Sequence, residues 1–505
     1  MSGVAIEKAG IVGAGVMGAG IAEVLAAGGL AVLLMDAEPG KAQSALDQIA
    51  KRQRARAAAG KTDPEAAERL LARIRPIDRL EGLADVDLVV EAIVERIEPK
   101  RDLVRALEAI VRPQAIIATN TSSLSVTAIA AAAANPERVA GYHFFNPVPA
   151  MKLVEVIRGA HTDPAIETAL VELTGRFGHR AVLASDTPGF IVNHAGRAFA
   201  TEALGMLREG VASIPRIDAI LRDAAGFRMG PFELMDLTGL DVSHPVMESI
   251  YGQYYQDPRY RPSVIAAQRM TAGLLGRKSG KGFYAYDGAR QILPEEPPAP
   301  AGVAPASIVV LDDTPADEMR LLLEAAGHRV STDPAHAHGD AALVLVGLVG
   351  EDLTGAVARL KLPAAACVGF DAIFGLDNHL TLVSCPATSD NARSAALSVV
   401  ANAGRKATMI EDSCGAVCQR VVAMIVNIGC EIVEQAIATP SDVNAAVRLG
   451  LGYPHGPLEW GDKLGAGRVL KMLDTMHERT RDPRYRASLW LRRRAELGLP
   501  LDAAL

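Results

Sequence analysis

Residues 8–30, KAGIVGAGVMGAGIAEVLAAGGL, place a short apolar segment before three glycines and an alanine-rich segment after them. Gly13, Gly15 and Gly18 form the GxGxxG pattern, which joins a strand to a helix through a tight turn. The second glycine lets a pyrophosphate approach the backbone, and the free N–H groups at the start of the helix attract the anion. The stretch therefore predicts the first βαβ unit of a dinucleotide-binding sheet.

The next apolar segment ends at Asp36, near the offset of about 20 residues at which an acidic side chain binds a ribose 2′-hydroxyl. A carboxylate there would repel a 2′-phosphate, and no arginine follows it directly. We therefore predict NAD rather than NADP as the cofactor. The alternative is a glycine turn that binds nothing.

Two further strands are predicted at 85–93 and 114–122, with a helix over 98–111 between them. This alternation favours a parallel sheet covered by helices on both faces, so the fold class is α/β in this part of the chain. Ligands of such sheets lie at the carboxyl ends of the strands. The candidate residues at those ends are Glu95, Asn120, Thr121 and Ser122.

The segment GYHFFNPVPAMKLVEVI (141–157) is mostly apolar but contains His143 and Glu155. The NPVP turn predicts a hairpin that brings the glutamate beside the imidazole. A carboxylate on one ring nitrogen fixes the tautomer and stabilises the imidazolium that forms when the other nitrogen accepts a proton. With a nicotinamide at the glycine loop to accept a hydride, His143 would be the base that converts an alcohol to a ketone. The alternative is a core histidine bonded only to backbone.

The composition excludes several classes of protein. The 505 residues are 49% hydrophobic and 22% charged, and the net charge of −7 argues against general nucleic-acid binding. No apolar run reaches the roughly 20 residues of a membrane span, and the N-terminus has no signal-peptide pattern, so we expect a cytoplasmic protein. The five cysteines lack paired CxxC spacing, which predicts free thiols and no metal site.

Five motifs together carry a family resemblance. GAGVMGAGIA, NTSSLS, HFFNPVPAMKLVEV, DTPGFIVN and GFRMGPFELMDLTGLD follow one another between about residues 5 and 287. This part of the chain resembles the L-3-hydroxyacyl-CoA dehydrogenases, which implies an NAD-binding Rossmann domain followed by an all-α domain. The implied reaction is the NAD-dependent, reversible oxidation of an L-3-hydroxyacyl-CoA to a 3-ketoacyl-CoA, in fatty-acid or aromatic-compound catabolism.

The resemblance also implies roles for individual residues. His143 would be the base and Glu155 its orienting partner, while Ser122 and Asn193 would hold the substrate and polarise the forming ketone. The implied cofactor-binding residues are Gly13, Gly15, Val16, Met17, Gly18, Asp36, Glu95, Lys100, Ser122, Asn146 and Lys278.

The segment AKRQRARAAAGK (50–61) departs from the family pattern. The family places a serine and, seven residues later, a lysine for CoA on this helix, but the corresponding positions here are Arg52 and Ala59. Arg52 and Arg56 are the replacements we expect to contact CoA phosphates by charge. A solvated basic helix face is the alternative.

The chain repeats itself after a Pro- and Ala-rich stretch. GYPHGPLEWGDKLG at 452 resembles GFRMGPFELMDLTG at 226, and DPRYRASL at 482 resembles DPRYRPSV at 257. The second half is therefore predicted to hold a degenerate Rossmann-like segment and a second helical domain. The predicted parts are a Rossmann domain at 1–186, a helical domain at 187–287, a linker at 288–305, the degenerate segment at 306–408 and the second helical domain at 409–505.

The second half lacks the residues of the predicted site. Asp371 falls where His143 would be, no glutamate matches Glu155, and Gln419 falls opposite Asn193. We expect one active site per chain, in the first half. The second helical domain would pack on the first, as an intramolecular pseudo-dimer, or else the chain would form a homodimer.

Three functions fit these observations. The first is the oxidation of a 3-hydroxyacyl-CoA, with 3-hydroxybutyryl-CoA or 3-hydroxyadipyl-CoA as substrate, the latter because the organisation resembles that of phenylacetate-degradation enzymes. The second keeps NAD and His143 but takes a free hydroxy acid, as L-gulonate dehydrogenases do. The third is a non-catalytic NAD-binding structural protein, which would have no use for the residues Ser122, His143, Glu155 and Asn193.

Overall fold

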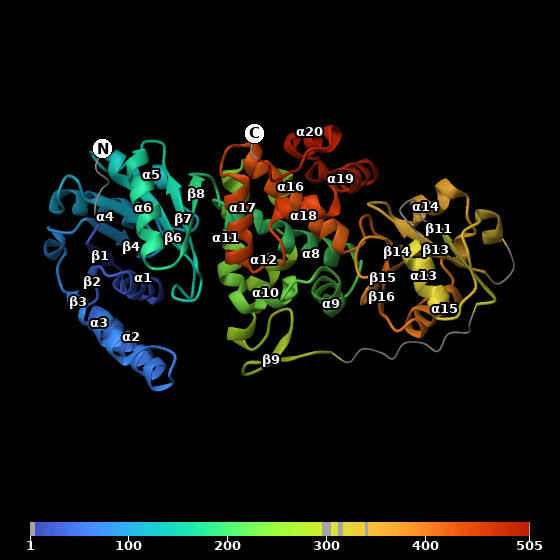
Figure 1. Cartoon of the computed structure of the whole chain (residues 1–505), viewed down its shortest axis with the longest axis horizontal. Helices are drawn as coiled ribbons and strands as arrows, with labels where there is room; N and C mark the ends of the chain where they lie inside the picture. Colours follow the sequence, from blue (N-terminus) through green and yellow to red (C-terminus); the bar gives the residue numbers. More distant parts are fainter. Residues whose placement is uncertain (1–5, 295–304, 312–316, 339–341, 504–505) are drawn as a thin grey trace. The chain divides into compact units, whose positions relative to one another are not determined.

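The computed structural model describes residues 6–294, 305–311, 317–338 and 342–503. These residues form two compact units, each built around its own large sheet (Figure 1). The first unit holds the chain up to His194 together with residues 435–451. The second holds the described residues of 195–434 and 452–503. A Rossmann-type sheet, a helical region and a second Rossmann-like sheet are all present, so the predicted fold class is confirmed.

The first sheet has eight strands in the order β3-β2-β1-β4-β5-β6-β7-β8. Every neighbouring pair is parallel except β6 and β7, which form the predicted antiparallel hairpin. The strands are β1 Lys8–Val12, β2 Ala31–Met35, β3 Ile74–Ile77, β4 Leu88–Glu91, β5 Ile116–Thr119, β6 Val139–Phe144, β7 Leu153–Arg158 and β8 Arg180–Ser185.

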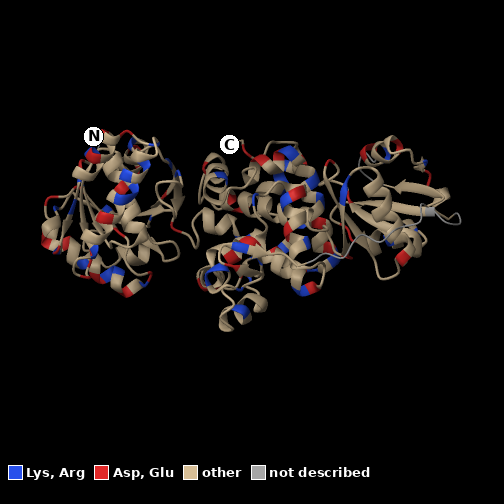
Figure 2. Cartoon of the chain, turned by 90° about the horizontal axis from the view of Figure 1, so that it is seen from below, with Lys and Arg blue, Asp and Glu red and all other residues tan. Residues whose placement is uncertain are grey.

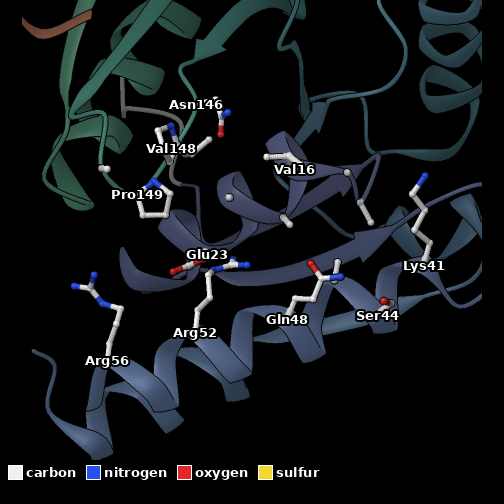
Figure 3. A pocket seen from close by; sticks show the side chains of 17 residues that line it. Val16, Glu23, Lys41, Ser44, Gln48, Arg52, Arg56, Asn146, Val148 and Pro149 are labelled. Atoms are coloured by element: carbon white, nitrogen blue, oxygen red, sulfur yellow. Dashed lines mark hydrogen bonds and ion pairs between the residues drawn. The ribbon is translucent and has the colours of Figure 1, made fainter. Parts of the chain in front are cut away.

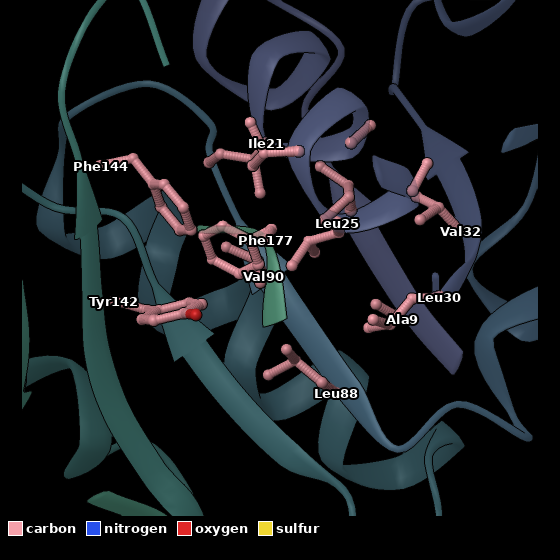
Figure 4. Packing of buried hydrophobic residues seen from close by; sticks show 14 of the residues in the cluster. Ala9, Ile21, Leu25, Leu30, Val32, Leu88, Val90, Tyr142, Phe144 and Phe177 are labelled. Carbon is pink, nitrogen blue, oxygen red and sulfur yellow. The ribbon is translucent and has the colours of Figure 1, made fainter. Parts of the chain in front are cut away.

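Helices cover both faces of this sheet because its strands are apolar on both sides. Leu88 and Val90 contribute to one buried cluster, which also contains Leu25 of α1 and Phe177 after α6 (Figure 4). Val89, between them, points the other way into a cluster with residues of α4 and α5. The helices of this unit are α1 Val16–Ala27, α2 Lys41–Ala58, α3 Pro64–Ala72, α4 Ile97–Ile110, α5 Val126–Ala130, α6 Pro164–Arg176, α7 from Val192 and α17 Pro440–Leu451, with η1 Leu80–Leu83 and η2 Pro136–Arg138.

The second sheet repeats this arrangement with six strands in the order β12-β11-β13-β14-β15-β16. Its one antiparallel pair, β14 with β15, corresponds to β6 with β7. The elements are β11 Ser307–Leu311, α13 Asp317–Ala325, β12 Val330–Ser331, η5 Pro334–His338, β13 Ala342–Leu348, α14 Leu353–Leu360, η6 Ala364–Ala366, β14 Cys367–Asp371, β15 His379–Ser384, α15 Asp390–Asn402 and β16 Lys406–Glu411. The turn between β11 and α13, where a glycine loop would stand, lies outside the described residues.

Helices from both repeats pack together in the second unit, where α16 contacts α8, α18, α19 and α20. The first repeat provides α8 Arg197–Glu209, α9 Ile214–Ala225, α10 Pro231–Thr238, α11 Leu240–Gln253, η3 Pro258–Tyr260, α12 Val264–Thr271 and η4 Arg277–Ser279. The second provides α16 Cys418–Glu434, α18 Pro457–Leu464, α19 Ala466–Thr480, η7 Pro483–Tyr485 and α20 Leu489–Leu497. A hairpin of β9 Ala285–Asp287 and β10 Arg290–Ile292 opens the predicted linker, most of which lies outside the described residues.

The internal repeat extends to backbone detail. Asp186 accepts the N–H of Val126 at the start of α5, and Asp412 accepts the N–H of Leu353 at the start of α14. A few residues after each aspartate, Phe190 and Ala416 both adopt left-handed backbone angles, with φ of 49° and 44°. The same capping and the same strained turn in both halves indicate one ancestral unit that was duplicated. The domain boundaries given above stay a prediction.

Lysine and arginine positions are interspersed with those of aspartate and glutamate along the helices (Figure 2). Among the described residues, no helix is both long and apolar enough to cross a membrane. The five cysteines are free thiols, and only Cys414 is more than slightly exposed.

The buried ion pair between α8 and α16 yields a stability prediction. Arg420 Nε lies 2.8 Å from a Glu202 carboxylate oxygen, and both side chains are at most 4% exposed. Arg420→Met would remove the nearer of the two guanidinium groups that bind this buried carboxylate, the other being that of Arg484 at 3.4 Å, so we expect the free energy of unfolding of the second unit to fall by about 3 kcal/mol. Arg208→Met is the control, because Arg208 is 56% exposed and lies 3.9 Å from Glu209. Urea denaturation that gives equal losses for both variants would contradict the prediction.

Candidate active site

The glycine loop between β1 and α1 fits a dinucleotide pyrophosphate. A Cβ atom on Gly13 would lie 2.4 Å from the Ala92 carbonyl oxygen, and one on Gly18 would lie 1.7 Å from the Gly13 oxygen. These two glycines are required by the close packing of loop, strand and helix. At Gly15, by contrast, no heavy atom lies within 4 Å of the Cβ position. That open side at the N-terminus of α1 is where a phosphate can approach.

Asp36 is positioned at the end of β2 by hydrogen bonds to the glycine loop. Its carboxylate accepts the N–H of Ala14 at 2.7 Å and that of Glu38 at 3.0 Å, and Lys41 lies 3.6 Å away. Burial opposes ionisation, but these N–H donors and Lys41 outweigh it and lower the pKa of Asp36. The side chain therefore stays charged beside the loop, as binding of a ribose hydroxyl requires.

Glu95 organises the loop after β4 and the loop after β5. Its Oε1 accepts the Thr121 hydroxyl at 2.7 Å and the Ser122 N–H at 2.8 Å, while Lys100 lies 3.2 Å from Oε2. Burial raises the pKa of Glu95, but Lys100 and these donors outweigh that effect and lower it overall. Lys100 is only 1% exposed and also binds Glu91 at 2.7 Å, so it is a buried structural cation.

His143 and Glu155 lie directly opposite each other in the β6–β7 hairpin. His143 Nδ1 is 2.7 Å from Glu155 Oε2, and the two side chains are 6% and 0% exposed. A carboxylate can only accept, so Nδ1 carries the proton and Nε2 is left as the basic nitrogen. The structure thus has the geometry of a general base with an orienting carboxylate.

The buried carboxylate of Glu155 connects this pair to the next element. Its Oε1 accepts the N–H groups of Ile191 at 3.0 Å and Val192 at 2.8 Å, just where α7 begins. Asn193 follows at once, and its side-chain amide donates to the Ser122 carbonyl at 3.3 Å. The four predicted catalytic residues therefore belong to two sets of hydrogen bonds within the first unit, and these sets meet at the adjacent residues Val192 and Asn193.

A cavity of about 520 Å³ lies between the glycine loop, α2 and the loop that begins at Asn146 (Figure 3). Arg52 and Arg56 reach toward it from α2, one turn apart. Arg52 is partly committed, because it lies 2.7 Å from the buried carboxylate of Glu23, although its side chain is still 48% exposed. Arg56 Nε donates to the Thr62 hydroxyl across a long 3.4 Å contact.

Lys278 is in the second unit, where it forms an ion pair with Asp241. The other predicted site residues, Gly13 to Asn193, are all in the first unit. Sequence reasoning missed Glu23 and Glu91, the two buried acids that hold Arg52 and Lys100. The available signal was a lone acidic residue within an otherwise apolar helix or strand.

The second half contains a counterpart of this site, in which other side chains stand at the positions of the predicted catalytic residues. In the β14–β15 hairpin, Phe370 pairs with Leu382 as Tyr142 pairs with Val156 in the first hairpin. Continuing that register by one residue puts Asp371 and Thr381 at the positions of His143 and Glu155.

Gln419, the counterpart of Asn193, donates to the Leu348 carbonyl at 2.7 Å and to Asp371 Oδ1 at 2.8 Å, and is fully buried. Gln419 thus satisfies one oxygen of Asp371, whereas the Thr381 hydroxyl has no hydrogen-bond partner among the described residues, and this pair contains no imidazole base. No group of three metal-ligating side chains occurs among the described residues either.

Asp371 gives a pH prediction for this counterpart site. Burial raises its pKa from 3.8 to about 6, and its Oδ2 has no hydrogen-bond partner among the described residues. The folded state thus holds the proton more tightly than the unfolded chain, and this stabilisation is lost as the pH rises from about 4 to about 6.

Asp371→Asn removes that titration, so the variant should gain up to about 3 kcal/mol relative to the unmutated protein between pH 4 and pH 7, with turnover unchanged. Urea denaturation at several pH values measures the difference. A constant stability difference across this range would contradict the titration of Asp371.

Both halves of the chain match the domains of one known protein family. Residues 8–187 match the NAD-binding domain of 3-hydroxyacyl-CoA dehydrogenases, and residues 189–286 and 415–502 match the C-terminal domain of the same family. The predicted NAD cofactor and the duplication of the helical domain are thereby confirmed.

Similar proteins cover the whole chain as well as its first half. A 3-hydroxyadipyl-CoA dehydrogenase of Escherichia coli K12 is 37% identical over 97% of this chain and 98% of its own length. A 3-hydroxybutyryl-CoA dehydrogenase of Bradyrhizobium diazoefficiens is 40% identical over 57% of this chain and 98% of its own length. The crystal structure of a 3-hydroxybutyryl-CoA dehydrogenase from Escherichia coli K12 matches 98% of this chain and 99% of its own, with a TM-score of 0.86 and 37% identity. The chain belongs to the 3-hydroxyacyl-CoA dehydrogenase family.

Proposed function

We propose that this protein oxidises the 3-hydroxyl group of an L-3-hydroxyacyl-CoA to the ketone, reversibly and with NAD. The observation that supports this most directly is the buried His143–Glu155 pair, which accepts the N–H of Val192. The next residue, Asn193, donates from its side chain to the Ser122 carbonyl. A base of this kind is needed only where a proton leaves the substrate. A scaffold protein would have no use for it.

His143 Nε2 accepts the proton of the 3-hydroxyl group. Glu155 stabilises the imidazolium that results, because its Oε2 already accepts the Nδ1–H at 2.7 Å. When bound, NAD supplies the acceptor for the hydride that leaves the same carbon. In the reverse direction the imidazolium returns the proton to the carbonyl oxygen.

Ser122 and Asn193 are assigned to the substrate oxygen and the forming ketone. The Ser122 hydroxyl makes only a long contact, 3.4 Å, with Glu95, so it can turn to donate to a ligand. The Ser122 backbone is fixed at both sides, since its N–H binds Glu95 and its carbonyl accepts from Asn193. Fixed donors of this kind stabilise developing negative charge on a carbonyl oxygen.

The cofactor would be held by the glycine loop, Asp36, Glu95 and Asn146, with buried Lys100 holding Glu95 in place. Lys278 stays a predicted cofactor contact. The CoA phosphates would bind in the cavity that Arg52 and Arg56 line. The names of its relatives support a short 3-hydroxyacyl group. The relative that is similar over 97% of this chain is named for 3-hydroxyadipyl-CoA. We place the reaction in the cytoplasm, in fatty-acid or aromatic-compound catabolism.

We further propose one active site per chain and an intramolecular pseudo-dimer of the helical repeats. The packing of α16 on α8 and the Arg420 pairs with Glu202 and Glu209 support it, because they bury the faces that the two repeats share.

A free hydroxy acid is the second candidate substrate. It is favoured by the engagement of Arg52 with Glu23, which leaves Arg56 as the main cation for a CoA phosphate on α2. Both candidates use the same base and the same cofactor, so only the substrate separates them.

The test is NADH formation with 3-hydroxybutyryl-CoA, 3-hydroxyadipyl-CoA and the two free acids, followed at the absorbance of NADH. Turnover of the thioesters alone is expected. The ratio of the two kcat/KM values then identifies the preferred acyl group. Turnover of the free acids alone would contradict the CoA assignment but keep the mechanism, and no turnover of any of the four would refute both.

His143→Gln tests the base. The amide cannot accept the hydroxyl proton, so kcat should fall by roughly 10²- to 10⁴-fold while NAD affinity, measured by calorimetry, stays the same. His161→Gln is the control, because His161 is an exposed residue outside both sets of hydrogen bonds. Unchanged kcat in His143→Gln would remove His143 from the mechanism.

A further inference from the structure

The first unit contains one helix that comes from the far end of the chain. Helix α17, from the second helical repeat, contacts strands β7 and β8 of the NAD-binding sheet. Strand β8 is the edge of that sheet, and an edge strand leaves backbone groups without partners. The segment around α17 supplies partners for this edge.

Two anchors hold the segment along β8. The Ser185 N–H donates to the Ile437 carbonyl at 2.9 Å. The side chain of Asp442 lies 3.2 Å from an Arg180 guanidinium nitrogen and accepts the Leu183 N–H at 3.5 Å. With the edge strand bound at both points, α17 cannot move away from the sheet without breaking these bonds.

The end of α17 then touches the residues that hold Glu155. A Cβ atom on Gly450 would lie 2.9 Å from Leu153 and 3.0 and 3.1 Å from the two methyl groups of Val192. Val192 is the residue whose N–H donates to Glu155 at 2.8 Å, and it immediately precedes Asn193. Leu153 is on the same face of β7 as Glu155.

We propose that α17 of the second repeat positions the catalytic site of the first, with Gly450 as the contact residue. This rests on the proposed function. Because Gly450 has no side chain, the helix can pack directly against Val192. This contact fixes the position of the Val192 N–H, which orients Glu155, and the direction in which Asn193 points. The second repeat, whose own counterpart of the site lacks an imidazole base, thus takes part in catalysis as a positioning element.

The reciprocal helix provides a matched control. Helix α9 of the first repeat contacts the second sheet, where the Glu411 N–H donates to the Val211 carbonyl at 2.9 Å, as Ser185 does to Ile437. Ala224, which corresponds to Gly450, lies 3.1 Å from where a Cβ of Gly375 would be. A change at Ala224 therefore disturbs an equivalent helix contact, but against the sheet that has no catalytic pair.

Gly450→Ala is the test variant. Alanine is the better helix former, so a residue of no positional importance would gain thermal stability from this change. We expect instead a fall in kcat of roughly 10-fold, because displacements well under 1 Å at the reacting groups are costly. The KM for NAD should not change. Ala224→Val should leave kcat unchanged.

Val192→Ala supplies the rescue, since it removes two of the three methyl groups that the new Cβ would meet, the third being that of Leu153. The double variant Gly450→Ala/Val192→Ala should recover to within about 3-fold of the kcat of Val192→Ala alone, as coupling between touching residues requires. An unaltered kcat in Gly450→Ala, a loss that the second change does not relieve, or an equal loss in Ala224→Val would each overturn the proposal.

A second readout does not depend on the substrate. Amide hydrogen exchange of Ile191 and Val192, which donate to Glu155, should accelerate in Gly450→Ala and return toward normal in the double variant. The two proposals can fail separately. If the unmutated protein turned over none of the hydroxyacyl substrates, the proposed function would be refuted, but the exchange rates would still test whether α17 positions these residues. Unchanged exchange in Gly450→Ala would refute that role.

Discussion

A fully buried carboxylate, that of Glu155, determines how the catalytic part of this protein is assembled. A charge without water must be given hydrogen bonds by the protein, or its burial would cost several kcal/mol. Glu155 obtains them from three places: the His143 imidazole on β6 and the N–H groups of Ile191 and Val192 at the start of α7. One side chain on β7 thereby fixes the positions of the base, of the first helix beyond the sheet and of Asn193.

The second half of the chain shows what happens to the same framework without that carboxylate. Thr381 stands in place of Glu155, and the Gln419 side chain turns inward to bind Asp371 and the Leu348 carbonyl. A largely parallel sheet with two strands fewer, its antiparallel hairpin and the helix cap at the start of α14 are kept. The fold thus does not depend on the catalytic residues, whereas the catalytic geometry depends on the fold. Helix α17 gives a physical reason for the second half to be retained, because it supplies partners for the edge strand of the active sheet.

The regions proposed for the cofactor and for the substrate are built in contrasting ways. The cofactor side consists of backbone and buried ion pairs, such as Lys100 between Glu91 and Glu95, which keep it rigid. The cavity beside α2 instead carries arginines with half-exposed side chains, of which Arg52 is held by Glu23. A rigid glycine-loop region suits a cofactor that does not vary. The more exposed arginines on α2 stand where the family pattern has other residues for CoA.

The amino-acid sequence by itself determined the dinucleotide loop, the His143–Glu155 hairpin and the internal duplication. These are recorded in short patterns of glycine spacing, turn residues and repeated motifs, which act over a few residues or by direct similarity. It did not determine the strands at 74–77 and 180–185, which are short and partly polar. Only the tertiary structure decided that Glu23 holds Arg52, that Glu155 binds the start of α7, and that residues 435–451 join the first unit. Those contacts join residues from about 30 to more than 250 positions apart, and they follow from how helices and edge strands close over one another, which no local periodicity encodes.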